Sequence, residues 1–352
     1  MDVEQSLSSL RITPEILKLI AEIDEFKGAW RALRAIAPER LAALRHVATV
    51  ESVGSSTRIE GARLSDRDVE RLLSDLDAHS FRSRDEEEVA GDAEVMEAIF
   101  DGWEAMTLTE NHVKQLHQML LRHSSKDGRH RGEYKKLPNH VKAFNADGQS
   151  LGIVFATTSA LETPWRMEEL TAWTRESLAL GTWHPLLIIA VFVVRFLAIH
   201  PFQDGNGRLS RILTTLLLLR AGYAYVPYSS LESVIEASKE SYYLALRRTQ
   251  TTLSQDTPDW EPWVLFFVRA VQRQKTHLEE KVAREQAWGT ALPALAVQIL
   301  ELTREHGRVT TAQIETLTGE SRSTIKARLS GLVASGKLAR HGQGRSTWYA
   351  LG

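Results

Sequence analysis

The chain has 352 residues, of which 43% are hydrophobic and 25% are charged, and its formal net charge is −2. This length predicts two or three domains, and the near-neutral charge excludes a chain-wide attraction to nucleic acid or to an anionic membrane. The chain contains no cysteine, which excludes disulfides, cysteine-ligated zinc and a cysteine nucleophile, and fits a cytoplasmic location.

Helical periodicity dominates the part of the chain before residue 125. Thr13 followed by Pro14 is typical of an N-cap and a first helical residue. A short helix over 49–61 is predicted to end near Gly61. The helices predicted here begin at Pro14, Pro38, residue 49, Asp85 and residue 110.

Residues 128–163 differ because short β-prone pieces alternate with Gly, Pro and Asn. Asp147-Gly148 between two such pieces predicts a hairpin over about 139–155. The apolar run at 186–199 is too short to span a bilayer, so it predicts a buried core helix and no membrane partner. Helices are predicted to resume over 166–181, 186–199, 206–221, 230–235, 238–253 and 261–287.

The end of the chain changes again after a weak linker at 289–293. The predicted order there is a helix, a short helix, a third helix and a two-stranded hairpin, which resembles a winged helix. Residues 321–352 contain six Lys or Arg and no Asp or Glu. The cations predicted to face DNA phosphates over 321–345 are Arg322, Lys326 and Arg328, near the recognition helix, and Arg345 in the wing. Protein contacts or homodimerisation are the alternative uses of such a module.

The stretch HPFQDGNGRLSR, residues 200–211, follows the buried helix and contains groups that handle phosphate. Gly205, Asn206 and Gly207 stand between two predicted helices, where backbone N–H groups can face an anion. Such a loop by itself is also compatible with a structural turn. The pattern of a Walker A phosphate loop is absent.

The remaining polar residues of this stretch favour a transfer reaction. Arg208 and Arg211 lie three apart on one helix face, and guanidinium groups form forked bonds to phosphate oxygens. Asp204 is placed to hold Mg²⁺, and His200 is the obvious proton acceptor. Together they predict transfer of a phosphorus-containing group to a hydroxyl.

Residues 200–211 fill every position of H-x-F-x-[DE]-G-N-G-R-x-x-R, so the chain resembles the Fic (filamentation induced by cAMP) family over roughly residues 50–255. The resemblance implies a mainly α fold, a Fic-type helical bundle with a small β-hairpin flap, here with a C-terminal winged-helix domain. Lys135 stands where the family often has Arg, and it lies outside the catalytic loop.

The resemblance implies adenylyl transfer from ATP, with Mg²⁺, to a Ser, Thr or Tyr hydroxyl of a target protein or of the chain itself. Position by position, His200 is the base and Asp204 the metal ligand, while Gly205, Asn206 and Gly207 form the anion hole. Arg208 contacts phosphate, and Arg211 holds the γ-phosphate. The segment 139–155 is the flap that holds the target.

A second motif, SSTRIEG at 55–61, matches the family's inhibitory helix. Ser56 and Glu60 lie four apart on one predicted helix face, with Gly61 as its stop. By resemblance, Glu60 pairs with Arg211 and displaces the γ-phosphate. In some relatives the same Glu also supports removal of AMP, so a bifunctional enzyme is an alternative.

The sequence allows two roles for a pair of tyrosines and indicates a structural role for two histidines. Tyr242 and Tyr243 line the adenine pocket if they follow the family, and otherwise they pack within a helix bundle. His117 and His184 are interpreted as structural, since no His-Glu or His-His cluster suggests zinc.

The predicted domains are 1–105 (helical, with the inhibitory helix at about 50–61), 106–288 (the Fic core with its flap) and 289–352 (the winged helix). Three functions fit this organisation. The first is an autoinhibited protein adenylyltransferase. The second is a related transferase with another donor. The third is a DNA-binding regulator in which the Fic core senses a nucleotide.

Overall fold

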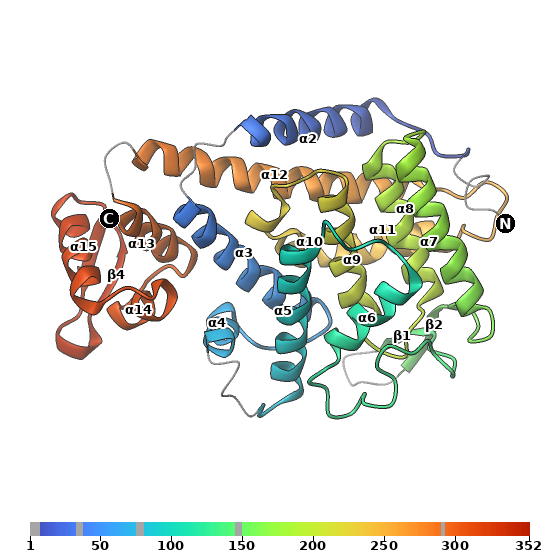
Figure 1. Cartoon of the computed structure of the whole chain (residues 1–352), viewed down its shortest axis with the longest axis horizontal. Helices are drawn as coiled ribbons and strands as arrows, with labels where there is room; N and C mark the ends of the chain where they lie inside the picture. Colours follow the sequence, from blue (N-terminus) through green and yellow to red (C-terminus); the bar gives the residue numbers. More distant parts are fainter. Residues whose placement is uncertain (1–7, 33–37, 75–80, 145–149, 290–292) are drawn as a thin grey trace. The chain divides into compact units, whose positions relative to one another are not determined.

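The structure is a computed structural model, and it describes residues 8–32, 38–74, 81–144, 150–289 and 293–352. Helices dominate these residues, as the sequence predicts (Figure 1). Before the C-terminal part they are α2 (Pro14–Ala32), α3 (Pro38–Ile59), α4 (Asp66–Ser74), α5 (Arg84–Gly102), α6 (Glu110–Leu120), α7 (Thr163–Leu180), α8 (Pro185–Ile199), α9 (Asn206–Arg220), α10 (Leu231–Ala237), α11 (Lys239–Gln250) and α12 (Glu261–Gly289), with a short 3₁₀ helix, η2 (Val226–Tyr228).

The chain divides into two compact units. The first unit comprises residues 1–33 and 48–275, and the second comprises residues 34–47 and 276–352. Helices α3 and α12 therefore each contribute residues to both units. None of the helices among the described residues is long and apolar enough to cross a membrane.

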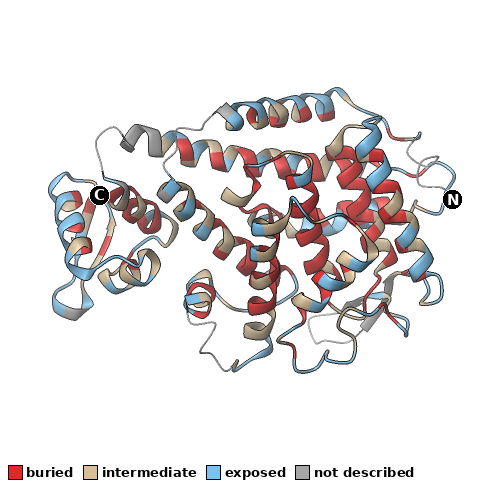
Figure 2. Cartoon of the chain, viewed as in Figure 1, coloured by how far each residue is buried: buried red, intermediate tan, exposed pale blue. Residues whose placement is uncertain are grey.

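The core of the first unit is built around α8. Its sequence, PLLIIAVFVVRFLAI, is apolar all round, and nearly every side chain is buried, as the red ribbon of Figure 2 shows. Helices α7, α9 and α11 pack against it, and α5 and α6 pack against α9. This packing fixes the end of α8 and the start of α9, where residues 200–211 lie.

Side-chain caps set several helix starts. Thr109 accepts a hydrogen bond from the backbone N–H of His112 at the start of α6, and Ser83 accepts one from Glu86 at the start of α5. Thr13 accepts one from Ile16, so α2 begins at Pro14 as predicted. The helix predicted to open at Asp85 begins one residue earlier, at Arg84.

Helix α3 is one continuous helix, so the prediction of a separate short helix over 49–61 is wrong. Nothing between Pro38 and Ile59 breaks the hydrogen-bond ladder, since Gly54 is tolerated within a helix. A Cβ at Gly54 would lie 2.7 Å from the Asp66 carboxylate and 2.8 Å from Arg58, so a larger residue here would displace the ends of these two side chains. Helix α4 was not predicted from the sequence.

A small hairpin precedes α7. Strand β1 (Val141–Phe144) pairs antiparallel with β2 (Ser150–Phe155), with irregular register near both ends of β1. The predicted strands of the flap are therefore present. The predicted turn residues Asp147 and Gly148 lie outside the described residues.

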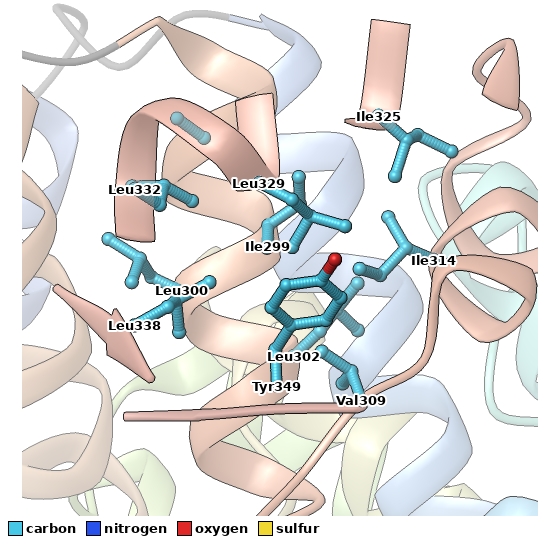
Figure 3. Close-up of a cluster of buried hydrophobic side chains, with 11 residues drawn as sticks. Ile299, Leu300, Leu302, Val309, Ile314, Ile325, Leu329, Leu332, Leu338 and Tyr349 are labelled. Carbon is cyan, nitrogen blue, oxygen red and sulfur yellow. The ribbon is translucent and has the colours of Figure 1, made fainter. Parts of the chain in front are cut away.

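The second unit has the helix order of a winged helix. It contains α13 (Ala294–Glu305), α14 (Thr311–Thr318), α15 (Arg322–Ala334), β3 (Leu338–His341), the 3₁₀ helix η3 (Gly344–Ser346) and β4 (Trp348–Leu351). Strands β3 and β4 pair antiparallel, and Val309 extends this sheet by a bridge to Tyr349. Figure 3 shows the buried side chains of all three helices meeting Tyr349 and Val309, which forms a core of its own.

Candidate active site

The motif at 200–211 joins two buried helices through a tight loop. His200 ends α8 in a left-handed backbone conformation (φ 53°), and its N–H donates to Phe196 O. Gly205 precedes α9, also left-handed (φ 77°), as glycine readily permits. Among the described residues His200 is the one non-glycine residue with positive φ. The loop thus turns the chain between the helices at the cost of backbone strain at His200.

The ring of His200 is oriented for proton acceptance. Its Nδ1 lies 3.3 Å from Leu197 O, and because a carbonyl can only accept, Nδ1 carries the proton and Nε2 does not. Burial, aided by the nearby positive charge of Lys135, lowers the pKa of His200 to about 4. The imidazole is therefore neutral near pH 7 and has an available lone pair on Nε2.

A polar clamp from the segment before the hairpin holds the backbone of this loop. Lys135 Nζ donates to Ile199 O at 2.9 Å, and the Lys135 N–H donates to Pro201 O at 2.8 Å. Asn139 Nδ2 donates to both His200 O (2.9 Å) and Phe202 O (2.6 Å). These bonds meet the orphaned carbonyls at the end of α8.

The side chains of the clamp also bind one another. Lys135 Nζ donates to Asn139 Oδ1 at 2.8 Å and to Thr157 Oγ1 at 3.1 Å, and Thr157 donates to Asn139. Burial lowers the pKa of Lys135 to about 8. Lys135 was expected to lie outside the loop at 200–211, with no role assigned. Its side chain bonds Ile199 O, directly before this loop, and its backbone N–H bonds Pro201 O within it. Asn139 and Thr157 were missed because no local pattern marks them.

His117 packs against the loop at 200–211 and forms a hydrogen bond to it. Its ring stacks on Phe202 with centroids 3.7 Å apart. The Gly132 N–H donates to Nδ1, so Nε2 carries the proton and donates to Asp204 O at 3.0 Å. Burial lowers the pKa of His117 to about 4, which keeps it neutral. His117 does not line the large cavity, in keeping with a structural role.

The glycine loop is stabilised by its own polar residues. The Asn206 side chain accepts from Phe202 N–H at 2.9 Å and donates to Phe202 O at 2.7 Å. Asp204 Oδ1 accepts from Gly205 N–H at 2.8 Å. The amide of Asn206 is thus committed to shaping the loop, which leaves its backbone N–H at the N-terminus of α9 to face the cavity.

Arg211 is buried beneath the segment SSTRIEG (55–61) at the end of α3, with its side chain 4% exposed. Its Nε donates to Ser56 Oγ at 3.1 Å, and its Nη2 donates to Ser56 O at 2.8 Å and to Glu60 Oε1 at 2.9 Å. The helical spacing of Ser56 and Glu60 brings both acceptors to one guanidinium. Charge-assisted bonds of this kind are about twice as strong as neutral ones.

The Glu60 carboxylate also lies against the glycine loop. A Cβ built on Gly207 would collide with Glu60 Oε1, so the carboxylate sits on the first turn of α9. A helix N-terminus attracts negative charge, and Arg211 adds a full positive charge there. Glu60 thus occupies the position that an anionic ligand of this loop would take.

Two further residues, Arg58 and Asp92, lie close to the Arg211 site, and Arg58 holds the end of α3 in place. Arg58 forms a forked pair with Glu236 of α10 (2.7 and 2.9 Å) and bonds Asp66 at 2.8 Å. Asp92 of α5 is buried near Arg208 and Arg211, and burial raises its pKa to about 7 against their opposing effect. Neither Arg58 nor Asp92 follows from the sequence pattern.

A cavity of about 1220 Å³ opens over these residues. His200, Asp204, the glycine loop and Arg208 line it together with Glu60 and Gly61. Tyr242 and Tyr243 of α11 also line it. Tyr242 is nearly fully buried and packs edge-on against Trp263 and Tyr243, whereas Tyr243 is 43% exposed. Ser56 and Arg211 do not line this cavity, because Glu60 covers Arg211.

The hairpin borders the same cavity. Val141, at the start of β1, and Phe155, at the end of β2, are among its lining residues. The hairpin therefore lies where a segment reaching His200 would pass.

Comparison with known proteins relates two parts of the chain to described families. Residues 107–218 match the Fic/DOC family, within which residues 200–211 supply the loop described above. This region is a Fic domain. Residues 294–352, in the second unit, match a family described as the C-terminal domain of a transcriptional regulator that is DIP2311-like.

Proteins similar over most of the chain carry the Fic name. "Protein adenylyltransferase Fic" of Drosophila melanogaster is 26% identical over 329 residues, which cover 92% of this chain and 58% of that protein. The chain thus spans less than three fifths of that curated relative's length. A Fic family protein from Desulfovibrio desulfuricans G20 aligns over 97% of both chains (TM-score 0.60, 22% identity), and a Fic domain containing signaling protein from Bacteroides thetaiotaomicron aligns over 86% of this chain and 98% of its own (TM-score 0.59, 23% identity). These structures share the Fic fold.

Proposed function

We propose that this chain is a protein adenylyltransferase that transfers AMP from ATP to a hydroxyl side chain of a target protein or of itself. The observation that carries the proposal is one cavity lined by a neutral His200, the N-terminus of α9 and two tyrosines. A base beside an anion site and aromatic surfaces suits a purine nucleotide. The relatives named adenylyltransferases support this choice of donor.

The proposed reaction follows from the placement of His200. Nε2 of His200 accepts the proton of the target hydroxyl, whose oxygen forms a bond to the α-phosphorus of ATP. The bond from this phosphorus to the oxygen bridging to the β-phosphate breaks, and pyrophosphate leaves. Backbone N–H groups at Asn206 and Gly207, with Arg208, face the phosphate oxygens and stabilise their charge. The Gly205 N–H, also expected in this anion hole, donates to Asp204 Oδ1 instead.

The residues present fit the expected metal. No cluster of three or more His, Cys, Asp or Glu among the described residues forms a cage for a metal ion. Mg²⁺ usually binds one or two carboxylates together with substrate phosphates and water. Asp204, 38% exposed in the cavity wall, would be its protein ligand. When bound, Mg²⁺ supplies positive charge to the phosphates.

Autoinhibition is the second part of the proposal. Glu60 and a γ-phosphate compete for Arg211, so ATP with its γ-phosphate displaced is held in a poor orientation for attack. The supporting contact is the 2.9 Å bond between Arg211 Nη2 and Glu60 Oε1. A bifunctional enzyme, in which Glu60 also orients water to remove AMP, uses the same contact.

The test measures label transfer from α-labelled ATP, to lysate proteins and to the chain itself. Glu60→Gly should raise the rate about 10- to 100-fold, since a hydrogen bond to a charged group is worth about 1.5–3 kcal/mol. Adding His200→Ala to this variant should abolish the gain. Glu240→Ala, which removes another carboxylate from the cavity wall, serves as the control. No rise with Glu60→Gly would contradict the autoinhibition.

Two alternatives are separated in the same assays. Labelled UTP and CDP-choline offered in parallel identify a transferase that uses another donor. A DNA-binding regulator with a nucleotide-sensing Fic core is favoured by the family matched at 294–352. It predicts sequence-selective DNA binding that survives His200→Ala, with no label transferred by the Glu60→Gly variant.

A further inference from the structure

The first turn of α5 reaches across to the catalytic loop through Arg84. Its Nη2 donates to Asp204 Oδ2 at 2.6 Å, and its Nε donates to Glu88 Oε1 at 2.7 Å. Arg84 lies 120 residues before Asp204, so no local pattern predicts this contact. The side chain of Arg84 is 47% exposed and lines the large cavity together with Glu88 and Asp204.

Glu88 links this contact to the phosphate-binding side of the site. Its Oε1, which accepts from Arg84, also lies 3.8 Å from Nη2 of the buried Arg208. Charges therefore alternate along the cavity wall, from Asp204 through Arg84 and Glu88 to Arg208. Each carboxylate has a cation beside it, and Arg84 is held from two sides.

This arrangement affects the carboxylate that would hold Mg²⁺. Asp204 Oδ1 already accepts from Gly205 N–H, so Oδ2 is the oxygen directed to a cation, and Arg84 occupies it. A divalent ion at Oδ2 would stand within a few ångströms of the guanidinium, and like charges at that separation repel. Asp204 can bind either cation well, but not both.

We propose that Arg84 competes with the metal ion for Asp204 and so sets the metal concentration at which the site is loaded. This inference rests on the assignment of Asp204 as the metal ligand in the proposed function. Arg84 acts here as a positioning residue: it holds Asp204 and the loop until a metal–nucleotide complex displaces it. It is a restraint separate from Glu60, which acts on Arg211.

The experiment measures metal binding rather than turnover. Mn²⁺ is titrated into the full chain with saturating ADP, and bound Mn²⁺ is followed by electron paramagnetic resonance. Because a partly exposed ion pair is worth up to about 1 kcal/mol, Arg84→Gln should lower the half-saturating Mn²⁺ concentration about fivefold. Arg84→Lys keeps the charge but cannot bond both carboxylates in one fork, so its shift should be smaller.

Two controls make the outcome specific. Arg82→Gln removes the same charge two residues away, from an exposed side chain that does not line the cavity, and should shift Mn²⁺ binding far less. Asp204→Asn should abolish the ADP-dependent Mn²⁺ signal. Unchanged or weaker Mn²⁺ binding in Arg84→Gln would overturn the inference, and so would an equal shift in Arg82→Gln.

The result is distinguishable from failure of the proposed function. Mn²⁺ binding with ADP requires no transfer reaction, so an Arg84→Gln shift without any label transfer would leave the inference standing while the adenylyltransferase proposal fails. Mn²⁺ binding that is unchanged by Asp204→Asn would contradict the inference, even if AMP transfer is observed. Thermal melting of each variant checks that α5 remains folded, and Arg84→Lys is the variant read if Arg84→Gln is unstable.

Discussion

Helices α9 and α15 both carry basic residues near their N-termini, but in opposite environments. Arg208 and Arg211 of α9 are 3% and 4% exposed; Arg208 lies beside Glu88 of α5, and Arg211 beside Glu60, directly after α3. Arg322, Lys326 and Arg328 of α15 are exposed. The acceptors around a buried cation fix its geometry, so another residue cannot replace it. Solvated cations on a surface add separately to the binding of an anionic partner, so one can replace another.

The largest expected effect is a loss of stability on removing a buried cation of α9. Arg211→Ala removes one of the two cations near the buried Asp92 and leaves Ser56 without its donor, so we expect a loss of about 3 kcal/mol of unfolding free energy. Arg322→Ala should change it by no more than about 0.5 kcal/mol. Urea unfolding followed by circular dichroism measures both. Equal losses of unfolding free energy in Arg211→Ala and Arg322→Ala would contradict the idea that buried and exposed cations contribute differently to stability.

The next effect concerns the clamp on the catalytic loop. Asn139→Ala removes two donors to the backbone of His200 and Phe202, and a base displaced by about 1 Å can lose about 100-fold in rate. Label transfer in the Glu60→Gly background should fall to that extent while ADP binding is retained. Asn111→Ala, an exposed site on α6, is the control. A parallel loss of nucleotide affinity would indicate general disruption.

A smaller effect is expected in the pH dependence of transfer, which should differ between a buried histidine and an exposed one. Because burial lowers the pKa of His200 to about 4, the ring stays neutral and able to accept a proton down to about that pH. Transfer by the Glu60→Gly variant should therefore change by less than about twofold between pH 8 and pH 5, where an ordinary histidine of pKa about 6.5 would lose about 30-fold. A rate that halves near pH 6.5 would contradict the buried, neutral base.

The smallest effects should come from α15. If the second unit binds DNA, Lys326→Ala should weaken binding about two- to fourfold and reduce the slope of log affinity against log salt by about 1. Arg328→Ala should act alike, as interchangeable phosphate contacts do. Lys18→Ala, an exposed cation of α2, is the control. A loss of more than about tenfold from one of these residues would show a specific contact instead of an additive one.

Local patterns predicted the fold class, the apolar helix α8 and the hairpin strands, because each depends on residues close together in the chain. The motif at 200–211 was readable for the same reason: its spacing alone places His200, Asp204 and Arg208 around one turn. The 2.9 Å contact between Glu60 and Arg211 matches the expected pairing, and its inhibitory role stays a prediction.

Other long-range polar contacts could not be predicted. The Lys135–Asn139–Thr157 clamp, the Arg58–Glu236 pair and Arg84 against Asp204 each join residues from irregular stretches or from helices distant in sequence. The prediction of two helices was wrong because it placed a break just before residue 49, where neither Gly nor Pro interrupts the sequence and α3 continues unbroken.

The left-handed backbone of His200 has a consequence for engineering. The residue at this position after a helix is most often glycine, which adopts positive φ without strain. A redesign guided by stability alone would therefore favour glycine at position 200 and would remove the proposed base in the same step. Under the proposed function, activity and stability have opposite requirements at position 200, because the imidazole there is kept at the cost of backbone strain.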